Sequence, residues 1–122
     1  MDKVLAVAYL GDAVYELYIR DYLLSLNITK PNDLQKKSLD YVSARSQRRI
    51  LEILINKNLL TEEELDIVRR GRNAKGTKCK TTDIITYHIA TGLEYLFGML
   101  YLNKNSKRIE ELIKNITEVA ND

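Results

Sequence analysis

The sequence contains little cysteine, proline and glycine. Cys79 is its only cysteine, so the chain forms no disulfide of its own and nothing points to secretion. One proline and five glycines among 122 residues argue against a turn-rich β-sandwich. The start of the chain lacks the basic segment and apolar stretch of a signal peptide, so we expect a cytoplasmic protein.

The length and composition suit one compact domain. Hydrophobic residues make up 45% of the chain and charged residues 30%, which is an ordinary globular balance. We find no internal repeat and no linker, so we predict a single domain over residues 1–122. The most apolar stretch, residues 84–102, is interrupted by threonine, histidine, glycine and glutamate, which argues against a membrane span.

Apolar residues recur at helical spacing through most of the chain, and no segment alternates as a strand would. The expected helices run from Asp2 to about Leu26, Pro31 to about Tyr41, Ser43 to about Asn56, Thr61 to just before Gly71, about Asp83 to Asn103, and Lys107 to Ala120. Asp2 can cap the first helix, and Thr61 with Glu64 has the spacing of a capping box. The pattern therefore predicts an all-α fold.

The first of these helices is apolar on nearly every side. One stripe of the helix consists of Val7, Leu10, Val14 and Leu17, and the opposite side carries Leu5, Tyr9, Ile19 and Leu23. A helix of this kind belongs in the centre of a fold. The helix beginning near Asp83 is also strongly apolar, so we expect these two helices to form the core.

One segment of the chain is strongly basic. No acidic residue occurs from Ile67 to Thr82, whereas six basic residues do, namely Arg69, Arg70, Arg72, Lys75, Lys78 and Lys80. On a protein with a net charge of only +2, such a segment suggests contact with phosphate groups. A solvated loop with scattered charges is the alternative interpretation.

Carboxylates occur inside both apolar helices. Glu94 is the only fully charged residue within the second of them, and Asp12 and Glu16 lie in the first. Burying an ionised carboxylate is costly, so each needs a partner or a metal, and converging oxygen ligands suit Mg²⁺. The alternative is that each forms an ordinary ion pair with Arg20, His88 or a backbone amide. Three glycines would let the two helices approach closely, namely Gly11, Gly92 and Gly98.

Several of these segments resemble a known family. The sequence YLGDAVYE at 9–16 resembles the signature of the ribonuclease III superfamily, and GLEYLFG at 92–98 resembles its second motif. The sequences KPNDL at 30–34, VSA at 42–44, TEEE at 61–64 and RRGRNAK at 69–75 are similar to landmarks of its Mini-ribonuclease III branch. This branch has a nuclease domain and no double-stranded-RNA-binding domain. The resemblance covers about residues 4–103.

The resemblance implies a helical, homodimeric ribonuclease III-like domain that hydrolyses phosphodiester bonds of double-stranded RNA and leaves 5′-phosphates. It implies that Asp12 and Glu94 are catalytic and bind Mg²⁺, with Mn²⁺ as the alternative ion. The implied substrate is the precursor of large-subunit (23S) ribosomal RNA, and a ribosomal protein is the expected helper. The central helix carries four tyrosines that suit either a subunit interface or the core, namely Tyr9, Tyr15, Tyr18 and Tyr22.

Two positions depart from the larger superfamily. Ala8 and Thr91 stand where full-length ribonuclease III enzymes carry acids, so we expect no more than one stable Mg²⁺ on protein ligands. Without an accessory domain, RNA must bind the nuclease surface, through the six basic residues of 69–80 and further candidates in Lys36, Lys37, Arg45, Arg48 and Arg49. A non-cleaving RNA-binding module in ribosome assembly remains the alternative function, and a helical scaffold without RNA is the third.

Overall fold

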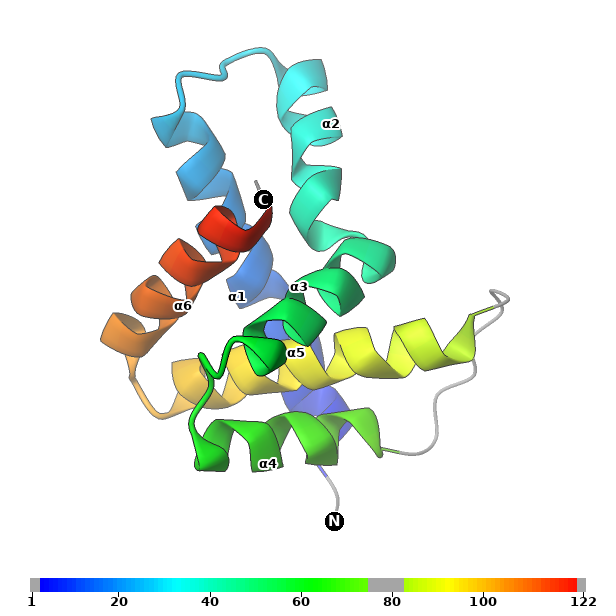
Figure 1. The fold of residues 1–122 in the computed structure, drawn as a ribbon. Helices are drawn as coiled ribbons and strands as arrows, with labels where there is room; N and C mark the ends of the chain where they lie inside the picture. Colours follow the sequence, from blue (N-terminus) through cyan, green and yellow to red (C-terminus); the bar gives the residue numbers. More distant parts are fainter. Residues whose placement is uncertain (1–2, 75–82, 121–122) are drawn as a thin grey trace.

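The structure, a computed structural model, describes residues 3–74 and 83–120. Throughout these residues the regular structure is helical (Figure 1). The six helices are α1 Val4–Ser25, α2 Pro31–Val42, α3 Ala44–Asn56, α4 Glu62–Arg72, α5 Ile84–Leu102 and α6 Ser106–Ala120. The predicted all-α fold is therefore confirmed. Five residues discussed in the sequence analysis lie outside the described residues, namely Asp2, Lys75, Lys78, Cys79 and Lys80.

Helix α5 is the centre of the fold. Eleven of its nineteen residues are buried, and α1, α3 and α4 pack against different sides of it (Figure 1). Tyr15 of α1 is fully buried, and its ring meets that of Phe97 edge to face at 5.1 Å between centroids. The Tyr15 hydroxyl donates to the carbonyl oxygen of Tyr41 over 2.8 Å, which links α1 to the end of α2. This bond and the ring contact fix α1 across α5.

Helix α1 buries only part of its apolar surface. Val14, Ile19 and Leu23 are buried as expected, but Tyr9 is 83% exposed and Leu17 65% exposed. The prediction that Leu17 belongs to a buried stripe is therefore wrong. The reason is geometric, because the helices that pack on α1, namely α2, α4, α5 and α6, leave Tyr9 and Leu17 uncovered.

The predicted helix ends are mostly confirmed. The Thr61 hydroxyl accepts from the Glu64 amide, and the Glu64 carboxylate accepts from the Thr61 amide, which completes the capping box. Helix α4 does not stop before Gly71 as predicted but continues to Arg72. A glycine often ends a helix, but Gly71 instead brings α4 into contact with α5, since a Cβ there would lie 2.7 Å from the Tyr95 Cβ.

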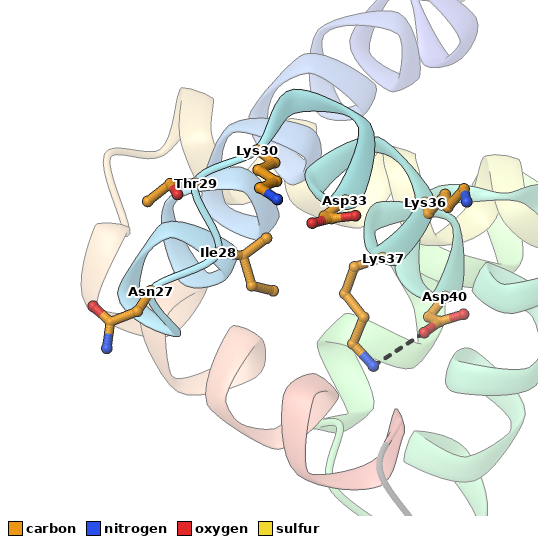
Figure 2. A pocket seen from close by; sticks show the side chains of 8 residues that line it. All are labelled: Asn27, Ile28, Thr29, Lys30, Asp33, Lys36, Lys37 and Asp40. Atoms are coloured by element: carbon orange, nitrogen blue, oxygen red, sulfur yellow. Dashed lines mark ion pairs between the residues drawn. The ribbon is translucent and has the colours of Figure 1, made fainter.

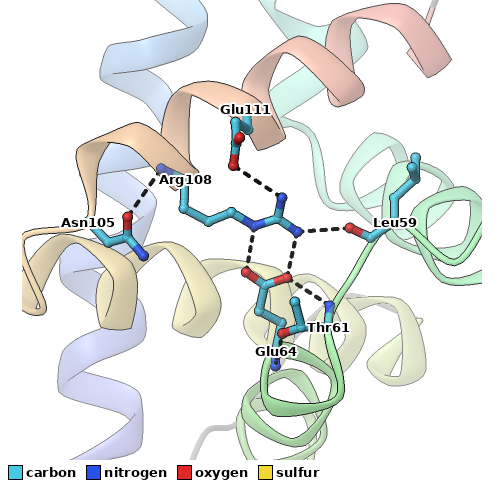
Figure 3. Close-up of polar contacts among 6 residues, drawn as sticks. All are labelled: Leu59, Thr61, Glu64, Asn105, Arg108 and Glu111. Carbon is cyan, nitrogen blue, oxygen red and sulfur yellow. Dashed lines mark hydrogen bonds and ion pairs between the residues drawn. The ribbon is translucent and has the colours of Figure 1, made fainter.

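A buried ion pair joins α4 to α6. Arg108 donates from Nε and Nη2 to the two carboxylate oxygens of Glu64, at 2.7 and 2.8 Å, and from Nη2 to the Leu59 carbonyl oxygen at 2.9 Å (Figure 3). Burial raises the pKa of Glu64, but the hydrogen bonds from Arg108 and Thr61 outweigh it and lower that pKa below its usual range. One carboxylate therefore caps α4 and anchors α6 at the same time.

Within residues 3–74 and 83–120, no helix has both the length and the apolar character needed to cross a membrane.

Candidate active site

Helices α1 and α5 touch through their backbones at the point where they cross. A Cβ placed on Gly11 would lie 1.7 Å from the Glu94 carbonyl oxygen, and one on Gly98 would lie 2.2 Å from the Val7 carbonyl oxygen. No side chain fits at either position, so the two glycines set the separation of the helices. Asp12 follows Gly11 directly, and it therefore lies at this crossing together with Glu94.

The structure brings the Asp12 and Glu94 carboxyl groups together. Burial raises the pKa of Glu94 to about 8, and the charge and hydrogen bond of Asp12 contribute next, followed by the charge of Glu16. A carboxyl group with this pKa keeps its proton at neutral pH unless a cation replaces it. The pair is therefore an electronegative site that a cation would relieve.

Ordinary ion pairing does not account for these two acids. Arg20 pairs with Glu16, at 3.8 Å between Nη2 and Oε2, and His88 meets the ring of Tyr87. Across residues 3–74 and 83–120, neither Asp12 nor Glu94 forms a salt bridge. The alternative of a structural ion pair with Arg20 or His88 is therefore contradicted.

The donor set fits one hard cation that keeps much of its water. No three histidine, cysteine, aspartate or glutamate side chains of the described chain converge closely enough to hold a metal. Two carboxylates remain, which is the number that Mg²⁺ typically takes from a protein. Ala8 is buried, and the Thr91 hydroxyl donates to the Tyr87 carbonyl oxygen at 3.0 Å, so neither position replaces the acid of the larger superfamily.

Glu16 belongs beside this site, although we did not include it among the predicted site residues. It lies one helical turn after Asp12 and is only half-buried, and its charge helps to raise the pKa of Glu94. The four-residue spacing from Asp12 was the signal available in the sequence, since it places both acids on one helix face.

The described part of the basic segment lies at the end of α4, against α5. Asp66 forms ion pairs with both Arg69 and Arg70, and the Arg70 guanidinium lies over the ring of Tyr95, 5.7 Å from its centroid. Gly92 allows α4 to pack closely on α5, because a Cβ there would lie 2.8 Å from the Val68 carbonyl oxygen. The prediction that Gly92 serves the approach to α1 is therefore wrong. Arg72 is exposed.

The two predicted RNA-binding lysines lie elsewhere. Lys36 and Lys37 are on α2, which packs on α1 and α3, and Figure 1 shows α2 and α4 at opposite ends of the view. Figure 2 shows both lysines at an open depression of about 660 Å³, where the Lys37 Nζ lies 3.2 Å from the Asp40 carboxylate. The structure therefore does not join these lysines to the α4 arginines in one continuous patch.

The three arginines of α3 differ in their surroundings. Arg45 and Arg49 are exposed, whereas the Arg48 Nη1 donates to the Thr86 hydroxyl at 2.9 Å. Arg48 also lies 3.8 Å from the carboxylate of Asp83, which caps α5. Arg48 therefore connects α3 to the start of α5.

The Ribonuclease III domain family matches residues 5–105, which is most of the chain. The chain belongs to the ribonuclease III family. Proteins named Mini-ribonuclease 3 are close relatives: that of Enterococcus faecalis is 51% identical over 89% of this chain and 83% of its own length. That of Staphylococcus aureus is 44% identical over 97% of this chain and 89% of its own length.

A solved structure agrees with this assignment. The crystal structure of a protein from Fusobacterium nucleatum has a TM-score of 0.82 and 33% sequence identity, covering 97% of this chain and 96% of the other. The resemblance to the Mini-ribonuclease III branch is thus confirmed, and the chain is an endoribonuclease. Ribonuclease III enzymes act on double-stranded RNA and in general depend on a divalent metal.

Proposed function

We propose that this endoribonuclease cleaves double-stranded RNA with Mg²⁺, or with Mn²⁺ as the alternative ion, held by Asp12 and Glu94. The observation that carries the proposal is the pair of coupled carboxyl groups at the α1–α5 crossing, which lacks a basic partner among the described residues. Burying two adjacent carboxyl groups without a basic partner lowers stability, and such pairs are typical of functional sites. The proposed unit is a single domain formed by residues 1–122.

The roles of the two acids follow from their chemistry. Mg²⁺, when bound, polarises the phosphoryl oxygens and lowers the pKa of a water molecule that attacks the phosphorus. Asp12 and Glu94 would hold the ion at the point where α1 and α5 cross, and the glycines beside them keep the two backbones in close contact there. Glu94 would release its proton on becoming a ligand, so metal binding should tighten as pH rises toward 8.

Two surfaces support the binding of a duplex by a homodimer. Arg69, Arg70 and Arg72 give the end of α4 a positive surface. The sequence offers Lys75, Lys78 and Lys80 as further RNA-binding candidates. The exposed apolar side of α1, with Tyr9, Leu17 and Leu24, suits self-association about a two-fold axis. Each subunit would then cut one strand. Precursor 23S ribosomal RNA as the substrate and a ribosomal protein as the helper rest on the family resemblance alone.

The test is cleavage of a long RNA duplex by the wild type, Asp12→Asn and Asp21→Asn, each with and without Mg²⁺. Asp21 is an exposed acid of α1 and provides a matched control for the loss of one negative charge. We expect double-strand cuts that require both Mg²⁺ and Asp12 and that Asp21→Asn leaves intact. Binding without cleavage by the wild type in any divalent metal would refute the proposal and favour the RNA-binding module.

A further inference from the structure

Asp66 is the only acid in the last two turns of α4, and it contacts two of the three arginines there. It accepts a hydrogen bond from Arg69, and its Oδ2 lies 3.4 Å from the Arg70 Nε. About half or more of each of the three side chains is exposed: 50% for Asp66, 64% for Arg69 and 47% for Arg70. Ion pairs this exposed contribute little to the free energy of unfolding, so stability does not explain the arrangement.

The arrangement also opposes the binding of RNA by charge alone. An acid between two arginines cancels part of the positive potential that would attract phosphate groups. A surface selected only for affinity would do better without Asp66. We therefore consider how Asp66 orients the arginine side chains that it contacts.

Arg70 is held from two sides. Asp66 contacts its Nε, and the ring of Tyr95 lies under the guanidinium at 5.7 Å. An arginine that uses Nε and one face in this way still has its two terminal nitrogens for a phosphate. Lysine has no planar fork with which to do the same.

The ring that supports Arg70 belongs to the helix that carries Glu94. Tyr95 is 5% exposed and directly follows Glu94 in α5. The end of α4 cannot shift relative to it, because a Cβ on Gly71 would lie 2.7 Å from the Tyr95 Cβ and 2.9 Å from the Gly92 Cα. Arg70 on α4 is therefore supported by a residue of α5, the helix that also carries Glu94.

We propose that Asp66 and Tyr95 are positioning residues that hold the Arg70 guanidinium for contact with a phosphate of the bound RNA duplex. This inference rests on the proposed function. Asp66 also contacts Arg69, but Arg70 alone among the described arginines lies over an aromatic ring. The contribution of Arg69 and Arg72 is electrostatic attraction. Orientation of this kind raises the cleavage rate of bound RNA, whereas attraction raises affinity.

The experiment is single-turnover cleavage of duplex RNA over a range of enzyme concentrations, which separates the maximal rate from the half-saturating concentration. Asp66→Asn is compared with Glu111→Gln, since Glu111 is an acid of α6 that is 54% exposed and lies 3.4 Å from Arg108. Both variants lose one negative charge beside an arginine. We expect Asp66→Asn to lower the maximal rate about tenfold without weakening affinity, and Glu111→Gln to leave the rate unchanged.

Two further comparisons test the contacts of Arg70. Arg70→Lys keeps the charge and should lower the maximal rate by a similar factor while the salt dependence of binding stays the same. Tyr95→Leu should also lower the maximal rate, whereas Tyr95→Phe, which keeps the ring, should retain the wild-type rate. Melting temperatures of all variants establish that they are folded at the assay temperature.

The outcomes are separable. A wild-type enzyme that does not cleave duplex RNA would overturn the proposed function and this inference together. With an active wild type, maximal rates of Asp66→Asn and Arg70→Lys equal to that of the wild type would overturn the inference alone. An equal loss in Asp66→Asn and Glu111→Gln would also overturn it, because net charge would then explain the effect.

Discussion

Replacing Glu94 by glutamine should stabilise the protein in the absence of metal, by an amount that depends on pH. The pKa of an unfolded glutamate is about 4.5, whereas that of folded Glu94 is raised to about 8 by burial and by Asp12. Between these values the folded state binds one more proton than the unfolded state. Stability of the wild type therefore falls as pH rises from 4.5 to 8, and the loss is complete above pH 8.

The size of the effect follows from the two pKa values. Each pH unit between them corresponds to about 1.4 kcal/mol. At pH 7 the wild type is therefore destabilised by roughly 3 kcal/mol, and above pH 8 by roughly 5 kcal/mol. Glutamine cannot ionise, so Glu94→Gln avoids this loss, and at pH 7 its melting temperature should be about 10 °C higher.

The assay is urea and thermal unfolding of the wild type and Glu94→Gln at several pH values from 4.5 to 8.5 in a metal chelator. Glu110→Gln, at an exposed position of α6, is the matched control and should follow the wild type at every pH. Added Mg²⁺ should reduce the difference in stability between Glu94→Gln and the wild type, because it stabilises only the protein that can bind it. A difference between Glu94→Gln and the wild type that does not change with pH would refute the reasoning.

Gly11→Ala and Arg108→Ala test the packing between helices. Gly11→Ala places a Cβ 1.7 Å from the Glu94 carbonyl oxygen, so it should cost at least about 3 kcal/mol in urea unfolding and lower cleavage; a stable and active variant would show that the helices separate freely. Arg108→Ala leaves the buried Glu64 carboxylate without its partner and should cost about 3 kcal/mol, whereas Glu111→Ala should cost less than about 1 kcal/mol; equal losses would contradict the role of the buried pair.

Local spacing was sufficient to predict the helices, the capping box and the pair of acids from the sequence. Helical periodicity and the reciprocal bonds of Thr61 and Glu64 act within a few residues, so no partner element is needed to recognise them. Asp12 and Glu94 stood out because an acid is rare in an apolar helix. The ordered motifs around them were enough to identify the family before any coordinates.

Contacts between segments far apart in the sequence decided which residues of α1 are buried, where α4 ends and what supports Arg70. Leu17 has the spacing of a core residue, but it is exposed because burial depends on which helices cover α1. Gly71 continues α4 instead of ending it, since the contact with α5 compensates for its poor helix propensity. The support of Arg70 by Tyr95 joins residues 25 positions apart in the chain, and only the packing of α4 on α5 brings them together.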